Sequence, residues 1–334
     1  MPVWFMRQAG RSLPEYRALR GTGSILDTIA RPDIACEVTL QPVRRYGVDV
    51  AVLFSDIVVP VHAIGFGVDV VPGRGPVVGE PITSAADLGR LRALEPEADI
   101  PHVIETVRLL RGELDPVGCT LLGFAGGPFT VASYLVEGGP SKTFSKVKSF
   151  MYADPALWDR LVDRLADLAI AFLTAQVHAG AQAIQLFDSW AGSLSRAQYT
   201  RFALPATQKV FTAVQGLGVP GVLFGVGTGE LLPLMATSGA DIIGVDWRVS
   251  LADAAQRTGG LPLQGNLDPA VCLAPCDVVL DAARDVLRDA ADVPGHIFNL
   301  GHGVLPETDP DTLAAVVDLV HREGLALRRE AGTR

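Results

Sequence analysis

The sequence predicts an α/β protein built as a single (β/α)8 TIM barrel. Eight short apolar runs rich in β-branched residues recur along the 334 residues, and segments with helical periodicity separate them. The runs are apolar throughout rather than alternating, which is typical of parallel strands buried on both faces. No G-x-G-x-x-G motif follows the first run, so we favour the barrel over the alternative, a doubly wound open sheet.

Each of the eight runs ends in a loop-forming residue, as a strand followed by a crossover helix should. They are PVWFMRQAG from Pro2, VDVAVLFSD from Val48, CTLLGFAGG from Cys119, AQAIQLFDSWAG from Ala181, PGVLFGVG from Pro220, ADIIGVDW from Ala240, LPLQGNLDP from Leu261 and HIFNLGHGV from His296.

The clearest helix is predicted over residues 154–180, where Leu157, Leu161, Leu165 and Phe172 recur on one face and Gly180 ends the pattern. The last helix should begin at Pro310, with Asp309 as its N-cap. Further helical patterns cover residues 196–215, 228–237, 275–291 and 310–329.

Residues 60–118 are too long for an ordinary crossover and contain the Gly/Pro-rich stretch GFGVDVVPGRGPVVGEP. We expect a small hairpin there, inserted after the second strand. The chain has no low-complexity tract or long linker, so residues 1–334 are interpreted as one domain.

The net charge of −9 argues against nucleic acid or an anionic membrane as the main partner. The first fifty residues are nevertheless locally basic, with seven arginines and five acids. No run of about 20 apolar residues and no secretory leader is found, and four scattered cysteines fit a reducing compartment, so we predict a cytoplasmic location. The CLAPC spacing of Cys272 and Cys276 has no second ligand pair, so no metal site is predicted.

A barrel of this kind carries its active site at the carboxyl ends of the strands. The polar residues expected at that mouth are Arg7, Arg11, Asp56, Tyr134, Asp188, Ser189, Asp246, Asn266, Asp268 and His302. Arg7 and Arg11 offer forked donors for carboxylates or phosphates, and Gly10 lets an anion approach the backbone. On the residues alone, Arg7 could instead form an ion pair with a barrel acid, and Asp56 could have a structural partner on a neighbouring strand. Tyr134 could be a packed core residue and His302 a structural histidine. No Walker A, dinucleotide-binding or H-E-x-x-H motif is present, so no cofactor is predicted.

Five segments, in order, resemble the signature segments of the uroporphyrinogen decarboxylase family. They are PVWFMRQAGRSLPEY, LFSDIVVP, GFAGGPFTVASYLVEGG, FDSWAG and NLGHGV, and together they span almost the whole chain. The resemblance implies a carboxy-lyase of porphyrin and haem biosynthesis: a homodimeric TIM barrel that removes the four acetate carboxyls of uroporphyrinogen III without a cofactor, giving coproporphyrinogen III. It also implies no nucleic-acid or membrane partner.

The resemblance also implies roles for single residues. Asp56 would accept hydrogen bonds from the pyrrole N–H groups, and Arg7, Tyr134 and His302 would join it in catalysis. The substrate-binding residues implied are Arg7, Gln8, Ala9, Gly10, Arg11, Arg20, Asp56, Tyr134, Phe187, Ser189 and His302.

Two departures from the family pattern stand out. Ser12 occupies a position where the family usually has an aromatic residue, which we expect to alter loop packing rather than chemistry. Family members also usually carry a lead-in of about twenty residues before the segment that begins here at Pro2, so cover of the first strand is expected to be reduced.

Two other functions remain open at this point. A zinc-dependent thiol methyltransferase would need an H-x-C ligand pair, and no His lies two residues from a Cys in this chain. A non-catalytic tetrapyrrole-binding relative would bind the macrocycle without turnover.

Overall fold

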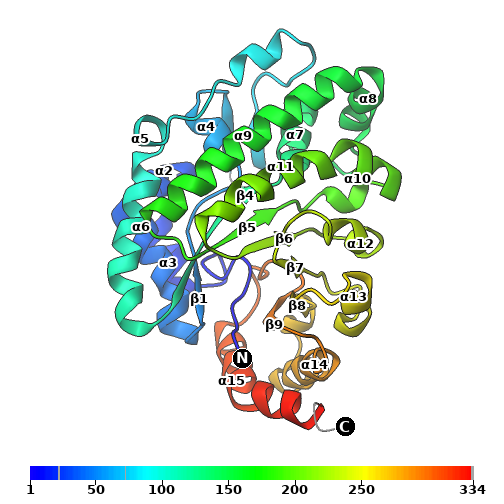
Figure 1. Cartoon of the computed structure of the whole chain (residues 1–334). Helices are drawn as coiled ribbons and strands as arrows, with labels where there is room; N and C mark the ends of the chain where they lie inside the picture. Colours follow the sequence, from blue (N-terminus) through cyan, green and yellow to red (C-terminus); the bar gives the residue numbers. More distant parts are fainter. Residues whose placement is uncertain (22, 72, 332–334) are drawn as a thin grey trace.

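A parallel sheet lies at the centre of the molecule, with helices packed around it (Figure 1). The computed structural model describes residues 1–21, 23–71 and 73–331. Within these residues the central sheet has seven strands, in the order β1-β4-β5-β6-β7-β8-β9, and every neighbouring pair is parallel. The strands are β1 (Val50–Val52), β4 (Thr120–Gly126), β5 (Ala183–Phe187), β6 (Gly221–Phe224), β7 (Ile242–Gly244), β8 (Leu263–Leu267) and β9 (His296–Leu300).

Seven of the eight predicted strands are therefore confirmed as strands of one parallel sheet. Their residues are buried on both faces, most completely in β6 and β8, which explains why the runs are apolar throughout. The α/β class is confirmed, whereas closure into an eight-stranded barrel stays a prediction at this point.

The first predicted strand forms only an isolated parallel bridge, between Val3 and Phe298 of β9. On its other side, the Val3 carbonyl accepts a hydrogen bond from Asp49 N, next to β1. The strand pairing does not continue along the segment, because the next backbone N–H groups donate to side chains instead of to a neighbouring strand. Phe5 N donates to Gln8 Oε1, and Met6 N donates to Asn299 Oδ1. Residues 2–6 thus lie between the two edge strands of the sheet.

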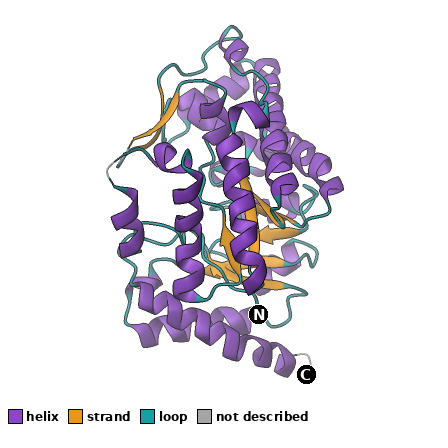
Figure 2. Ribbon diagram, turned by 90° about the vertical axis from the view of Figure 1, so that its left-hand side faces the viewer, coloured by secondary structure: helices purple, strands orange, loops and turns teal. Residues whose placement is uncertain are grey.

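Helices follow the strands, as the periodicity predicts. Figure 2 shows long helices alongside the strands. The α-helices are α1 (Pro14–Arg20), α2 (Ile25–Ile29), α3 (Pro32–Tyr46), α4 (Val59–Ala63), α5 (Pro96–Asp99), α6 (Pro101–Leu114), α7 (Pro128–Glu137), α8 (Ser145–Ala153), α9 (Pro155–Ala179), α10 (Arg196–Phe202), α11 (Leu204–Val214), α12 (Leu232–Met235), α13 (Leu251–Arg257), α14 (Cys276–Asp289) and α15 (Pro310–Ala331).

The predicted helix ends agree with the structure where a cap marks them. Helix α9 ends at Gly180, and α15 begins at Pro310, where Asp309 Oδ1 accepts a hydrogen bond from Asp311 N at 3.0 Å. The single helix predicted over residues 196–215 is wrong: α10 and α11 are separate helices. Ala203 leaves the helical conformation there and Pro205 opens the next helix, because proline lacks the N–H that a continuous helix would need.

The hairpin predicted within residues 60–118 is confirmed. Strands β2 (Val68–Val71) and β3 (Gly75–Val78) pair antiparallel as a second, separate sheet. Figure 2 shows this pair away from the central sheet. The hairpin is fixed to α7, since Val78 N donates to Gly138 O, and to the start of α2, since Ser24 Oγ donates to Val70 O.

A chain of buried side-chain hydrogen bonds runs from Trp4 through Gln264 to Gln185. It anchors residues 2–6 to the central sheet. Trp4 Nε1 donates to Gln264 Oε1 at 3.1 Å, and Gln264 Nε2 donates to Gln185 Oε1 at 3.0 Å. All three side chains are at most 1% exposed, so each hydrogen bond replaces one that water would have made. The segment that carries Arg7 is thereby bonded to β8 and, through it, to β5.

Gln264→Leu should therefore destabilise the fold, because it leaves Trp4 Nε1 and Gln185 Oε1 buried without partners. The expected loss is about 1–3 kcal/mol, measured as a lower midpoint of denaturant unfolding. Gln256→Leu, at an exposed position of α13, is the control and should change stability by less than about 0.5 kcal/mol. Equal stability of the two variants would show that this chain of hydrogen bonds makes no net contribution.

Candidate active site

A cavity of about 760 Å³ opens at the carboxyl ends of the strands. It contains every residue that the sequence assigned to substrate binding: Arg7, Gln8, Ala9, Gly10, Arg11, Arg20, Asp56, Tyr134, Phe187, Ser189 and His302 all line it. Its described lining includes four arginines and one acid, so its field attracts anions although the protein is acidic.

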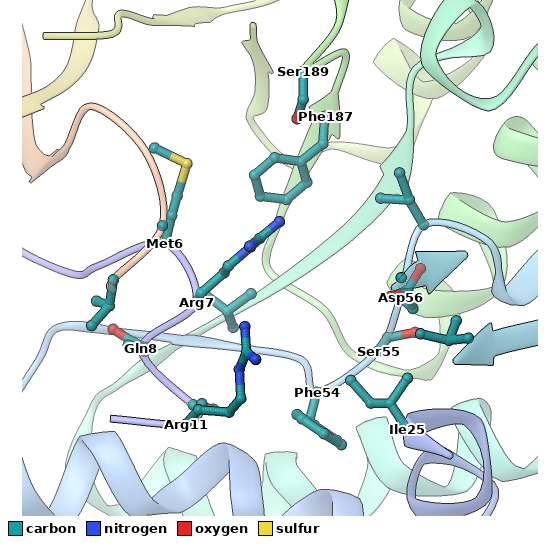
Figure 3. A pocket seen from close by; sticks show the side chains of 18 of the residues that line it. Met6, Arg7, Gln8, Arg11, Ile25, Phe54, Ser55, Asp56, Phe187 and Ser189 are labelled. Atoms are coloured by element: carbon teal, nitrogen blue, oxygen red, sulfur yellow. The ribbon is translucent and has the colours of Figure 1, made fainter. Parts of the chain in front are cut away.

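The loop after the first segment supplies two of those guanidinium groups. Figure 3 shows the side chains of Arg7 and Arg11 on this loop at one side of the cavity, with Asp56 at the other. Arg7 has a positive φ of 59°, and a Cβ on Gly10 would lie 2.8 Å from the Arg7 carbonyl oxygen. The tight turn therefore requires glycine at position 10, because a side chain would collide with the backbone.

Gln8 holds the loop in place rather than offering its amide to a ligand. Its Oε1 accepts from Phe5 N at 3.0 Å, and its Nε2 donates to the Val50 carbonyl at 2.9 Å. Arg17 supports the same loop by donating to the Arg11 carbonyl. Ser12 is buried and does not line the cavity, so it is placed behind the loop; its effect on loop packing stays a prediction.

Asp56 follows β1 and is the single acid among the described lining residues. One carboxylate oxygen, Oδ1, accepts a hydrogen bond from Val58 N at 3.0 Å, which holds the group beside the cavity. Burial raises the pKa of Asp56, while Arg7 and the backbone donors of the turn act in the opposite direction. Among the described residues Asp56 forms no salt bridge, and its hydrogen bonds come from the backbone of its own turn. The structural partner on a neighbouring strand, considered above as an alternative, is therefore not seen.

Tyr134, on α7, also lines the cavity. Its ring lies on Trp190, with centroids 4.0 Å apart and 33° between the planes. Burial raises the pKa of Tyr134 to about 12, and the negative charge of Asp56 adds to the effect. The hydroxyl therefore keeps its proton at neutral pH and can donate a hydrogen bond to a ligand.

Asp188 fixes the wall that carries Tyr134. Its Oδ1 accepts from Thr130 N at 3.0 Å and from Thr130 Oγ1 at 2.6 Å, at the start of α7. Thr130 Oγ1 in turn accepts from Trp190 N, which places the ring under Tyr134. Burial raises the pKa of Asp188 to about 6. Asp188 is thus a supporting residue, buried behind Phe187 and Ser189, which face the cavity.

His302 enters the cavity after β9. Its Nδ1 accepts from Gly303 N at 2.6 Å, so the neutral ring carries its hydrogen on Nε2. Burial lowers the pKa of His302 to about 4, and the positive charge of Arg7 lowers it further. The ring is therefore a neutral donor at physiological pH.

Four of the polar residues expected at the mouth do not line the cavity: Asp188, described above, and Asp246, Asn266 and Asp268. Asp246 binds the Arg248 guanidinium at 2.7 Å and the Gly227 N–H, and Asn266 Nδ2 donates to the carbonyls of Asp246 and Val249. Asp268 caps the turn at Ala270 N. These groups shape the loops after β6, β7 and β8, and the prediction that they line the mouth is wrong.

The sequence missed three polar contributors: Tyr16, Ser55 and Arg74, the last at the tip of the β2–β3 hairpin. The hairpin itself was expected, but nothing in its pattern indicated that its tip turns toward the strand ends. The apolar lining was also missed, because residues such as Ile25, Phe54 and Phe124 look like ordinary core residues in the sequence.

No group of three or more His, Cys, Asp or Glu side chains able to hold a metal ion occurs among the described residues. Cys272 and Cys276 are both unpaired, with Cys272 buried and Cys276 exposed. No helix in the described part of the chain is both long and apolar enough to cross a membrane.

Solved structures share the fold. A methyltransferase from Methanosarcina mazei superimposes with a TM-score of 0.69 at 22% identity, over 92% of this chain and 90% of the other. A B12-independent methionine synthase from Shewanella sp. W3-18-1 gives a TM-score of 0.60 at 15% identity, over 88% and 89%. At such identities the likeness describes the fold alone, and the missing H-x-C pair still separates this chain from thiol methyltransferase chemistry.

Curated sequences give much closer matches. The chain is 59% identical to a uroporphyrinogen decarboxylase from Streptomyces coelicolor, over 96% of this chain and 90% of the relative. It is 58% identical to one from Streptomyces griseus, over 96% and 88%. The family profile described as uroporphyrinogen decarboxylase (URO-D) matches residues 1–323. The chain therefore belongs to the uroporphyrinogen decarboxylase family.

Proposed function

We propose that this protein decarboxylates the four acetate side chains of uroporphyrinogen III to give coproporphyrinogen III, in tetrapyrrole biosynthesis and without a cofactor. The observation that carries the proposal is the single carboxylate, Asp56, in a cavity whose other described charges are arginines. Family membership supports the same substrate and reaction.

The arginines match the substrate's charge. Uroporphyrinogen carries eight carboxylates around a ring of four pyrroles, and guanidinium groups bind carboxylates through paired donors. Arg7, Arg11 and Arg20 all line the cavity. Apolar side chains such as Phe187 and Phe224 provide surface against which the macrocycle can pack.

Asp56 would face the centre of the ring and accept hydrogen bonds from the pyrrole N–H groups. A pyrrole acetate loses CO2 only after a proton is added to a ring α-carbon, which makes the ring cationic. The electrons of the broken C–C bond then enter the ring as CO2 leaves, and the resulting methylene takes a proton and becomes a methyl group. Loss of the proton first added to the α-carbon restores the neutral aromatic pyrrole, so each decarboxylation consumes one proton overall. A fixed, buried carboxylate stabilises the cation because it is already oriented and partly desolvated.

The neighbouring groups suit the supporting steps. Neutral His302 and protonated Tyr134 can donate hydrogen bonds to the reacting carboxylate or to the ring edge. Arg7 influences the pKa of Asp56, Tyr134 and His302, so it lies within electrostatic reach of all three. Arg7 or a bound water would supply the proton, and Ser189 and the backbone of residues 8–10 would complete the contacts.

We also infer the wider architecture. Residues 2–6, bonded to β9 on one side and to Asp49 on the other, would serve as the eighth strand that closes a single-domain (β/α)8 barrel over residues 1–334. A cytoplasmic homodimer is proposed on the family resemblance. Light scattering of the purified protein should give twice the monomer mass; a monomer at micromolar concentration would contradict the dimer.

The direct test is anaerobic incubation of the chain with uroporphyrinogen III, without added metal or cofactor, followed by oxidation and chromatographic counting of carboxyl groups. Successive species with seven, six, five and four carboxyls are expected. Binding of the macrocycle without loss of carboxyls would instead support the non-catalytic alternative.

Asp56→Asn should lower turnover by roughly 10²-fold or more, because it removes the negative charge that stabilises the ring cation. Stability should be retained, since burial of the ionised group is unfavourable in the native protein. Turnover and the thermal midpoint would be measured together. Asp268→Asn, at a strand end outside the cavity, is the matched control; wild-type turnover in Asp56→Asn would sink the assignment.

His302 should make the fold acid-sensitive in a defined window. Its pKa is about 4 in the folded protein against 6.5 for a free histidine, so the unfolded chain binds more protons between these values. The free energy of unfolding should fall as the pH drops from about 6.5 to about 4. In His302→Gln this fall should be smaller than in the wild type, because the titrating group is gone. Thermal midpoints at about pH 7.5 and about pH 5 test this, with His178→Gln, at an exposed site, as the control. Identical pH dependence in His302→Gln and wild type would contradict it.

A further inference from the structure

Most arginines in the described part of the chain are paired. They donate to carboxylates, as Arg44, Arg92 and Arg201 do, or to backbone carbonyls, as Arg164 does. Five have no side-chain hydrogen bond or ion pair with the residues described: Arg7, Arg11, Arg74, Arg108 and Arg160. Of these, Arg7, Arg11 and Arg74 line the cavity. Three of the five unpaired guanidinium groups thus lie where an anionic ligand would bind.

Arg74 comes from a different part of the fold than the other two. It sits at the tip of the β2–β3 hairpin, between Gly73 and Gly75, and its backbone N–H closes the turn on Val71 O at 3.1 Å. The two glycines have φ of 76° and 85°, values that side-chain-bearing residues rarely adopt, so the turn depends on them. Val70, Gly73, Gly75 and Pro76 line the cavity beside Arg74.

The hairpin is held firmly enough to place this charge. Val78 N donates to Gly138 O after α7, and Ser24 Oγ donates to Val70 O before α2. The strands of the hairpin are therefore held from two sides, one of them the helix that carries Tyr134. Arg74 itself is exposed, so it stands at the solvent edge of the cavity rather than near its floor.

We propose that Arg74 binds a peripheral carboxylate of the substrate and makes the hairpin tip an outer anion subsite of the cavity. This inference rests on the proposed function. A macrocycle with eight carboxylates whose reacting acetate lies near Asp56 must project other carboxylates toward the rim. Arg7, Arg11 and Arg20 lie on the side of the first segment and α1, so Arg74 offers a guanidinium to carboxylates that those three do not serve.

The test is steady-state kinetics of Arg74→Gln with uroporphyrinogen III. KM should rise by about tenfold, because a charge-assisted contact made equally in the ground and transition states is lost, while kcat changes by less than about twofold. Arg74→Lys should recover part of the affinity, since it keeps the charge but loses the paired donors. The ratio of the Arg74→Gln and wild-type KM values should shrink as salt is added, because an exposed charge is screened.

Arg160→Gln is the matched control: it removes an arginine that is likewise exposed and unpaired, but on the outer face of α9. Its KM should equal that of the wild type. An unchanged KM in Arg74→Gln, or a fall in kcat with KM unchanged, would overturn the subsite.

Failure of the subsite is separable from failure of the proposed function. If the wild type does not turn over uroporphyrinogen, the function fails, and the subsite is then tested by fluorescence titration with uroporphyrin III. Weaker binding of uroporphyrin III to Arg74→Gln than to Arg160→Gln would still support the subsite, and equal binding would exclude it.

Discussion

The hydrogen bonds that hold residues 2–6 between β9 and β1 are the constraint on which the site depends. Val3 bridges Phe298 on one side and accepts from Asp49 N on the other, and Trp4 is tied to Gln264 by its indole N–H. Because this segment is bonded to both edge strands, the loop that follows it lies at the cavity, where Arg7 to Arg11 form part of the lining. That placement brings Arg7 within electrostatic reach of Asp56, which lies beyond the end of β1.

The electrostatics of the cavity follow from this arrangement. A carboxylate that loses solvent is destabilised unless charges or donors compensate, and Asp56 is only partly compensated by Arg7 and the N–H groups of its turn. A cation in the cavity would offset the remaining penalty by pairing with the carboxylate. Tyr134 and His302, whose pKa values shift in opposite directions, both stay neutral at physiological pH and can act as donors. A single negative charge among neutral donors and arginines fits a polyanionic ring that becomes cationic during reaction.

The walls of the cavity show how supporting residues fix reactive ones. Asp188 binds the start of α7 through Thr130, and Thr130 holds the backbone of Trp190, on which the Tyr134 ring rests. A buried carboxylate with its own strong donors thus positions a residue that faces the ligand. From the sequence, Asp188 and Ser189 looked equivalent as strand-end polar residues. The side chain of Asp188 turns away from the cavity, toward α7, and that of Ser189 faces the cavity.

The sequence by itself determined the α/β class, seven of the eight strands and the hairpin after β1. The substrate-binding residues that the family resemblance implied all line the cavity, whereas several strand-end polar residues expected there do not. Periodicity and strand-end polarity are local properties, and the five signature segments mark the site directly. Only the tertiary structure decided which strand-end groups face the ligand. Asp246 and Asn266 are buried, so their polar atoms need hydrogen-bond partners. The Asp246 carboxylate binds Arg248, and the Asn266 amide donates to the Asp246 carbonyl, so neither side chain is left to face a ligand. Arg74 reaches the cavity because the hairpin is anchored to α7 and to Ser24, contacts between distant segments that no local pattern encodes.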